Sequence, residues 1–127
     1  MGDLSKNYSR HEWSCGCGCE FDIVDAELIY VMQTHISDYY GVVVGVTGGN
    51  RCIPHNNSTP GAARFSLHTE GKAADFRVRG VSPRAVYKRL NELFPDKYGL
   101  GLYEDRVHFD VRPDRARWNC TQRALPQ

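Results

Sequence analysis

Two segments of this chain alternate between apolar and polar residues, and each carries a potential metal ligand on its polar side. In segment 73–79 Ala74, Phe76 and Val78 take the even positions, which leaves Asp75 on the opposite side. In segment 107–111 they take the odd positions, which leaves His108 on the opposite side. This period of two is typical of a β-strand with one buried face. If the two strands are neighbours, Asp75 and His108 meet across the sheet, where facing Cβ atoms lie ~5 Å apart.

Two further residues complete a candidate catalytic site. His68 lies in the loop before the first strand, and Asp105 lies in the turn before the second. A catalytic zinc ion takes three imidazole or carboxylate ligands and leaves a fourth position to water. The pKa of that water falls from ~16 to ~7, and a nearby carboxylate can accept its proton. We therefore predict His68, Asp75 and His108 as ligands of one Zn²⁺ and Asp105 as the general base of an amide hydrolase.

Each of these residues, taken alone, has a plain structural explanation. A single histidine is more often a polar residue with ordinary hydrogen bonds than a ligand, and Asp105 is a natural turn residue. Glu104 also competes with Asp105 for the role of base. The prediction therefore depends on the combination: a histidine and an aspartate seven residues apart, and a second histidine with an acid three residues before it.

Apolar spacing and capping residues predict two helices. Asp25 is a suitable cap for a helix over 25–40, which Gly41 ends. Ser82 and the proline after it predict a second helix that runs to about residue 94. The side chains expected to point inward from this second helix are Val86, Leu90, Leu93 and Phe94.

Short apolar segments between the helices predict the strands of a sheet. Segment 42–47 predicts a short buried strand after the first helix. Segments 99–103 and 107–111 predict a hairpin joined at 104–106. Together with segment 73–79 they indicate an α+β domain with a small, mainly antiparallel sheet and flanking helices. Segment 48–66 is a long loop rich in turn-forming residues, and such loops in small domains are usually functional.

Length and charge narrow the class of protein. With 127 residues we expect a single domain over 1–127 and a monomer. A formal net charge of +1 gives no general attraction to nucleic acid. The aliphatic run 42–44 is far too short to span a bilayer, and the N-terminus lacks the apolar stretch of a secretory signal. We therefore expect synthesis in the cytoplasm and no membrane or nucleic-acid partner.

Three of the five cysteines lie close together in the N-terminal arm, 1–21. They are Cys15, Cys17 and Cys19, separated by single glycines. In an extended segment their sulfur atoms would point to one side. One interpretation is a buried strap of small residues packed on the core, because free cysteine is often buried. The other is a second metal or redox site, and we favour the strap.

At these motifs the sequence resembles a known family. Residues 66–75, Ser-Leu-His-Thr-Glu-Gly-Lys-Ala-Ala-Asp, match the Ser-x-His-x-x-Gly-x-Ala-x-Asp signature of the zinc D-Ala-D-Ala carboxypeptidases and related phage endolysins. Segment 105–112 resembles their second signature, in which an acidic residue precedes a histidine on a strand by three positions. Segment 51–56 resembles their Arg-x-x-Pro-x-x-Asn stretch.

The resemblance implies zinc-dependent hydrolysis of peptidoglycan stem peptides in the bacterial cell wall, on the small α+β fold shared with the hedgehog signalling domain. It implies His68, Asp75 and His108 as ligands and Asp105 as base. Arg51 would bind a substrate carboxylate or stabilise the oxyanion. Ser66 and Asp110 would support the site, with Asp110 orienting a ligand imidazole. Cleavage could be of the carboxypeptidase type or of the endopeptidase type, as in a phage lytic enzyme.

Two departures from the family pattern leave a second hypothesis open. Residues 48–50 are Gly-Gly-Asn where the family usually has Ser-Gly-Tyr, and Asp105 stands where many members have glutamate. The shorter side chain reduces the reach of the base by ~1.5 Å, and a misplacement of about 1 Å can cost roughly a hundredfold in rate. The alternative is therefore a catalytically silent, zinc-stabilised binding module of the same fold.

Overall fold

The computed structural model of the chain describes residues 4–13, 24–49 and 71–126. The first described segment ends in a short 3₁₀ helix, η1 (Arg10–Trp13). A longer helix then runs without a break through α1 (Ala26–Val31), η2 (Met32–Ser37) and α2 (Asp38–Tyr40), of which η2 has π-type hydrogen bonding. None of the helices in the described ranges is long and apolar enough to cross a membrane.

Five strands and one more helix follow in the described residues. They are β1 (Val44–Gly48), β2 (Ala73–Val78), α4 (Pro83–Leu93), β3 (Gly99–Leu102), β4 (Val107–Asp110) and β5 (Ala116–Asn119). The strands form one sheet in the order β1-β2-β4-β3-β5. Neighbours are antiparallel except β3 and β5, which run parallel. The prediction of an α+β fold with a mainly antiparallel sheet is confirmed.

The caps predicted from the sequence are present at both helices. The carboxylate of Asp25 accepts a hydrogen bond from the backbone N–H of Glu27. Gly41 ends this helix in the left-handed conformation, with φ of 65°, where glycine has no steric cost. The Ser82 hydroxyl accepts from the N–H of Ala85, and a proline occupies the first turn of α4. Caps of this kind fix where each helix begins and ends.

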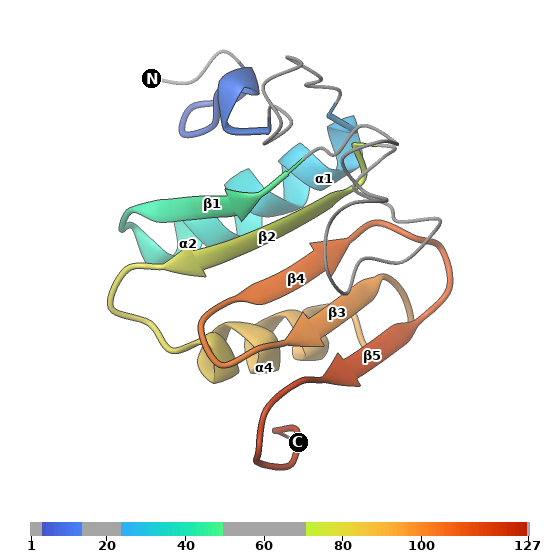
Figure 1. The fold of residues 1–127 in the computed structure, drawn as a ribbon. Coiled ribbons are helices and arrows are strands. Elements are labelled where there is room, and N and C mark those ends of the chain that lie inside the picture. The colour runs from blue at the N-terminus through green and yellow to red at the C-terminus, as the bar shows by residue number, and fades with distance from the viewer. Residues whose placement is uncertain (1–3, 14–23, 50–70, 127) are drawn as a thin grey trace, which may run out of the picture.

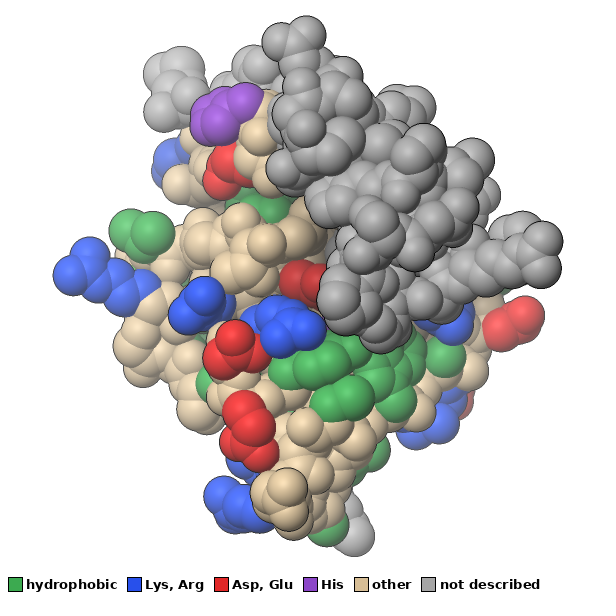
Figure 2. All heavy atoms as spheres, viewed as in Figure 1, with side chains coloured by type: hydrophobic (Ala, Val, Ile, Leu, Met, Phe, Trp, Pro, Cys, Tyr) green, Lys and Arg blue, Asp and Glu red, His purple; other side chains and the backbone are tan. Residues whose placement is uncertain are grey.

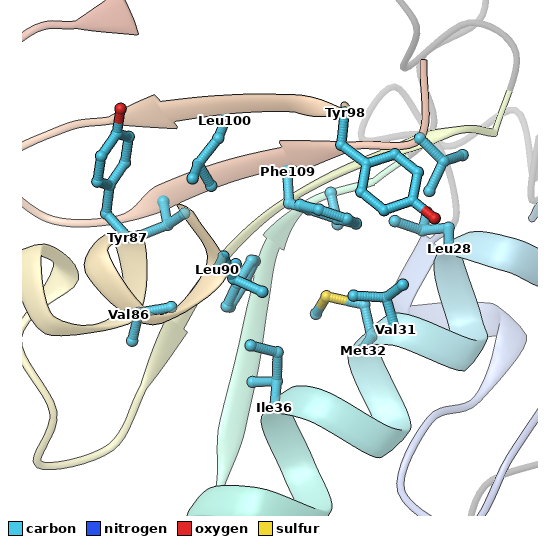
Figure 3. Close-up of a cluster of buried hydrophobic side chains, with 14 of the residues drawn as sticks. Leu28, Val31, Met32, Ile36, Val86, Tyr87, Leu90, Tyr98, Leu100 and Phe109 are labelled. Carbon is cyan, nitrogen blue, oxygen red and sulfur yellow. The ribbon is translucent and has the colours of Figure 1, made fainter. Parts of the chain in front are cut away.

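Among the described elements, the helices α1, α2 and α4 lie on one face of the sheet, as Figure 1 shows. Between helices and sheet lies a continuous hydrophobic core, part of which is drawn in Figure 3. The apolar residues of the alternating strands point into it, among them Phe76 of β2 and Phe109 of β4. The opposite, polar sides of these strands therefore form a second face on which none of the described helices lies, and which we call the helix-free face.

Three sequence predictions about the elements are corrected. Segment 42–47 was expected to be a buried strand, but β1 starts at Val44, and Val42 and Val43 are 43% and 65% exposed. The reason is that β1 is an edge strand, so it has a neighbour on one side only. Leu93 was expected to point inward but is 38% exposed, whereas Tyr87 of the same helix is buried. Strand β5 was not predicted at all.

The N-terminal segment 4–13 packs against the first helix through Tyr8 and against the end of β1 through Trp13. Trp13 and Tyr8 are fully buried, and their rings meet edge to face with centroids 5.5 Å apart. The hydroxyl of Tyr8 accepts a hydrogen bond from Ser37 Oγ at 2.6 Å and donates to the Met32 carbonyl at 3.4 Å. The strap interpretation of the cysteine segment stays a prediction. Cys15, Cys17 and Cys19 lie outside the described residues.

Candidate metal centre

The strand register places one residue from each strand in a single row across the helix-free face. Gly48 of β1 pairs with Asp75 of β2, and Asp75 pairs with His108 of β4. His108 in turn pairs with Gly101 of β3, which pairs with Trp118 of β5. The predicted meeting of Asp75 and His108 across neighbouring strands is therefore confirmed. Alternation and register together bring the two side chains together, since a slip of either strand by one residue would turn that strand's candidate ligand into the core.

His108 lies between two carboxylates. Its Nδ1 atom is 2.9 Å from Oδ1 of Asp75, and its Nε2 atom is 2.7 Å from Oδ2 of Asp110. The side chains of His108 and Asp75 are 10% and 20% exposed, whereas that of Asp110 is completely buried. One edge of the imidazole is thus held deep in the protein, and the other edge faces a carboxylate that solvent can reach.

The two carboxylates make the site strongly favourable to positive charge. Burial by itself lowers the pKa of His108, but the hydrogen bonds and negative charges of Asp110 and Asp75 outweigh it and raise that pKa above its ordinary value. Burial alone would raise the pKa of Asp110, yet hydrogen bonds from His108 and Arg112 hold it well below the usual range of a carboxyl. A cation is therefore stabilised at this point of the sheet.

The donor set fits a divalent metal ion. A neutral imidazole has one N–H donor and one lone pair, so it can donate to only one of its two carboxylate neighbours. If Nε2–H donates to the buried Asp110, the lone pair of Nδ1 faces an oxygen of Asp75, and either a second proton or a metal ion offsets the repulsion between these two acceptors. Imidazole nitrogen with carboxylate oxygen is a combination that suits zinc. His108 and Asp75 can thus provide two ligands, with Asp110 orienting the ring.

The remaining predicted site residues divide into two groups. Asp105 lies in the turn between β3 and β4, 60% exposed, and pairs with Arg106 at 2.9 Å; Arg106 Nε lies 4.0 Å from Oδ2 of Asp75. Arg106 therefore links the predicted base to a predicted ligand at the rim of the site. His68, Arg51 and Ser66 lie outside the described residues.

Residues 4–13, 24–49 and 71–126 hold no group of three or more histidine, cysteine, aspartate or glutamate side chains suited to a metal ion by themselves. The third ligand, predicted as His68, falls outside those ranges. The assignment of Asp75 and His108 as ligands stays a prediction, as do the roles of Asp105 and Asp110.

Trp118 lies beside His108 and forms an aromatic wall together with Tyr103, which the sequence did not predict. The ring centroids of Trp118 and His108 are 4.9 Å apart. The indole N–H of Trp118 donates to the hydroxyl of Tyr103 at 3.1 Å, and the guanidinium of Arg106 lies 4.1 Å from the centre of the Tyr103 ring. Figure 2 shows hydrophobic side chains gathered near the middle of this face with acidic and basic ones beside them. Such a surface offers both apolar contact and charge to a bound peptide.

Comparison with known proteins identifies one family. A family model described as Peptidase M15 matches residues 6–110. No curated protein and no solved structure matches the chain. The matched range includes Asp75, His108 and Asp110, and it ends before Arg112 and Trp118.

Proposed function

This chain belongs to the peptidase M15 family, and from that premise we propose that it is a zinc-dependent hydrolase of peptide bonds in the stem peptides of bacterial peptidoglycan. The observation that carries the proposal is the position of His108, with one nitrogen facing Asp75 and the other facing the buried Asp110. A peptidase needs a nucleophile and a means of polarising the scissile carbonyl. Zinc, when bound, supplies both by activating water and acting as a Lewis acid.

The chain's own residues would hold, orient and move protons around that centre. Asp75 and His108 would bind the metal from the exposed side of the sheet, together with His68. Asp110 would keep the His108 ring in one orientation. Asp105, at the rim, would take a proton from water and deliver it to the leaving amine. Arg51 would bind a substrate carboxylate or stabilise the oxyanion.

The substrate class follows from the resemblance of segments 66–75 and 105–112 to the D-Ala-D-Ala carboxypeptidases and phage endolysins. Stem peptides combine methyl side chains with several carboxylates. The aromatic wall of Trp118 and Tyr103, with Arg106 on it, offers matching apolar and cationic contacts. We propose that the protein acts at the cell wall, trimming a terminal D-amino acid or cutting within the stem as an endolysin does.

The test is a hydrolysis assay on purified peptidoglycan with wild type, Asp105→Ala and Glu104→Ala, with bound zinc quantified in each protein. Glu104 is the matched control, because it is the neighbouring exposed acid of the same turn. We expect about one zinc in all three proteins. Activity should fall by about a hundredfold or more only in Asp105→Ala, since general-base catalysis contributes 10²–10⁴-fold. The masses of the released fragments distinguish exo from endo cleavage.

Each other outcome has a definite meaning. Full activity of Asp105→Ala with zinc bound contradicts the proposed base, and loss of activity in Glu104→Ala alone moves that role by one residue. Zinc in every protein without any cleavage supports the catalytically silent binding module. No zinc in the wild type contradicts the assignment of His68, Asp75 and His108 as ligands.

A further inference from the structure

We infer that Arg112 is a positioning residue for the metal centre, because it holds His108 through two neighbours: Asp110, which bonds Nε2 of the ring, and Trp118, whose indole packs beside the ring at an angle. The inference rests on the proposed function, since it concerns the same histidine. It extends beyond the family match, because Arg112 and Trp118 both lie after residue 110, where that match ends.

The first contact runs through Asp110. Arg112 donates from Nε to Oδ1 and from Nη2 to Oδ2 of this carboxylate, both at 2.7 Å. The same Oδ2 atom lies 2.7 Å from Nε2 of His108. A planar guanidinium that binds both oxygens fixes the carboxylate plane as well as its position, which a single point charge cannot do. The carboxylate that receives the imidazole is therefore held in place by Arg112.

The second contact runs through Trp118. The guanidinium carbon of Arg112 lies 5.5 Å from the centre of the indole, and the indole and the imidazole have centroids 4.9 Å apart. A cation over an aromatic face within about 6 Å is attracted to it. The indole is also held at its N–H by Tyr103. The contacts thus form a closed circuit of four side chains, those of Arg112, Asp110, His108 and Trp118.

Two glycines of β3 make room for two of these four side chains. A Cβ atom at Gly99 would overlap the carboxylate of Asp110, and one at Gly101 would overlap the indole of Trp118. Both glycines lie beside β4 in the register, opposite Asp110 and His108. The Asp110 carboxylate and the Trp118 indole therefore lie against the backbone of β3 at these two glycines.

The consequence for the metal centre is geometric. Because Asp110 occupies Nε2, the nitrogen that faces Asp75 is Nδ1. If the Arg112 side chain is removed, Asp110 keeps His108 and the backbone N–H of residue 112 as partners but loses the two short side-chain bonds that fix its plane. The imidazole can then rotate with the carboxylate, and Nδ1 no longer has a single direction. Residues that orient a ligand imidazole typically affect metal affinity by 10–100-fold.

The experiment compares Arg112→Gln, Arg112→Lys and the control Arg77→Gln. Arg77 lies on the same side of β2 as Asp75 but is exposed, so its loss removes an equal charge from the same face. The zinc dissociation constant is measured by competition with a chromophoric chelator. We expect it to rise 10–100-fold in Arg112→Gln, by about three- to tenfold in Arg112→Lys, and by less than about twofold in Arg77→Gln.

A second readout uses the metal-free proteins. At a pH above the raised pKa of His108, where the imidazole is neutral, a long-range ¹H–¹⁵N spectrum shows which nitrogen of His108 carries the proton. It should show one defined state in the wild type and an averaged one in Arg112→Gln. If Arg112→Gln does not fold, Arg112→Lys carries the test, because it keeps the charge next to the buried Asp110 and lacks only the planar fork.

The outcomes separate this inference from the proposed function. Arg112→Gln or Arg112→Lys with wild-type zinc affinity and an unchanged His108 spectrum overturns the positioning role. A wild type that binds no zinc overturns the proposed function. In that case the His108 spectra of the metal-free proteins still decide whether Arg112 positions the ring.

Discussion

Gly101 shows how strongly a single residue on the helix-free face constrains the site. It lies in β3 between His108 of one neighbouring strand and Trp118 of the other. Any side chain at this position would occupy the volume of the indole. The absence of a side chain in β3 is therefore part of the site, because it lets Trp118 reach the imidazole from two strands away.

Gly101→Ala is expected to destabilise the protein and to displace Trp118 from His108. Overpacking of this kind typically costs about 1–3 kcal/mol. The control is Gly45→Ala in β1, where an added Cβ has no neighbour within 4 Å. That variant should be neutral or stabilising by a few tenths of a kcal/mol, because alanine restricts the unfolded chain. Urea unfolding of both variants measures the difference. Equal stability of the two would contradict the close packing of Trp118 over β3.

Residues of the site differ in how far the sequence could predict them. The pairing of Asp75 with His108 follows from alternation, which is a local property of each strand. Arg112 continues the same alternation two residues after Asp110, so its side was predictable but its bidentate contact was not. Trp118 could not be predicted, because its position depends on a parallel pairing between β3 and β5 that no local pattern indicates.

At the scale of elements, α4 supports the site from the opposite side of the sheet. Its buried residues Val86, Tyr87 and Leu90 pack in the core beneath β2, β4 and β3. The helix begins at a serine cap, where the Ser82 hydroxyl accepts from the N–H of Ala85 at 3.2 Å. The first N–H groups of a helix have no partner within it, so this bond stabilises the start of α4.

Ser82→Ala is therefore expected to lower the free energy of unfolding by about 1 kcal/mol. Ser82→Asp is the matched control, because a carboxylate can accept the same hydrogen bond and also interacts favourably with the N-terminal end of the helix dipole. Urea unfolding should rank wild type and Ser82→Asp together and Ser82→Ala below them. If both variants lose the same stability, the cap is not the source of the effect.

The sequence predicts well those elements whose ends carry capping residues. It does not predict elements that form only through contacts with segments distant in the chain. Asp25, Gly41 and Ser82 mark helix ends through local hydrogen bonds and backbone angles, so the sequence alone locates both helices. Strand β5 has no alternation of burial, since three of its four residues are half-buried. The π-type turn of η2 also has no sequence marker. It depends on tertiary context, where Gln33 of this turn bonds Ser5 and Asn7 of the N-terminal segment.

At the scale of the whole molecule, the sheet divides the protein into a stabilising side and a chemical side. The helical layer and the N-terminal segment 4–13 bury the apolar residues on one face. Asp75, His108, Asp110 and Trp118 all belong to the other face. This division could be predicted, because binary patterning of the strands determines it. The packing of segment 4–13 could not, since it depends on the aromatic contacts of Tyr8 and Trp13 with residues far along the chain.

The burial of Tyr8 also makes the free energy of unfolding of the whole molecule fall at alkaline pH. Burial raises the pKa of Tyr8 from its ordinary value of 10.0 to about 12, and the hydrogen bond from Ser37 offsets only part of this. The folded protein therefore keeps the phenol proton that the unfolded chain loses. Stability from this group is fully present below pH 10 and is lost as pH rises to about 12. Two pKa units correspond to about 3 kcal/mol.

Tyr8→Phe should therefore cost about 1 kcal/mol near neutral pH, because the bonds to Ser37 and Met32 are lost. Above pH 10 its stability should fall less steeply than that of the wild type, so that the two curves converge. Urea unfolding at intervals between pH 8 and about pH 11 measures both slopes. Tyr30→Phe, which removes a hydroxyl from a side chain that is 61% exposed, is the control and should follow the wild type throughout. Parallel curves for Tyr8→Phe and wild type would mean that the phenol is hydrated in the folded state, and that segment 4–13 is not packed on the helical layer through this ring.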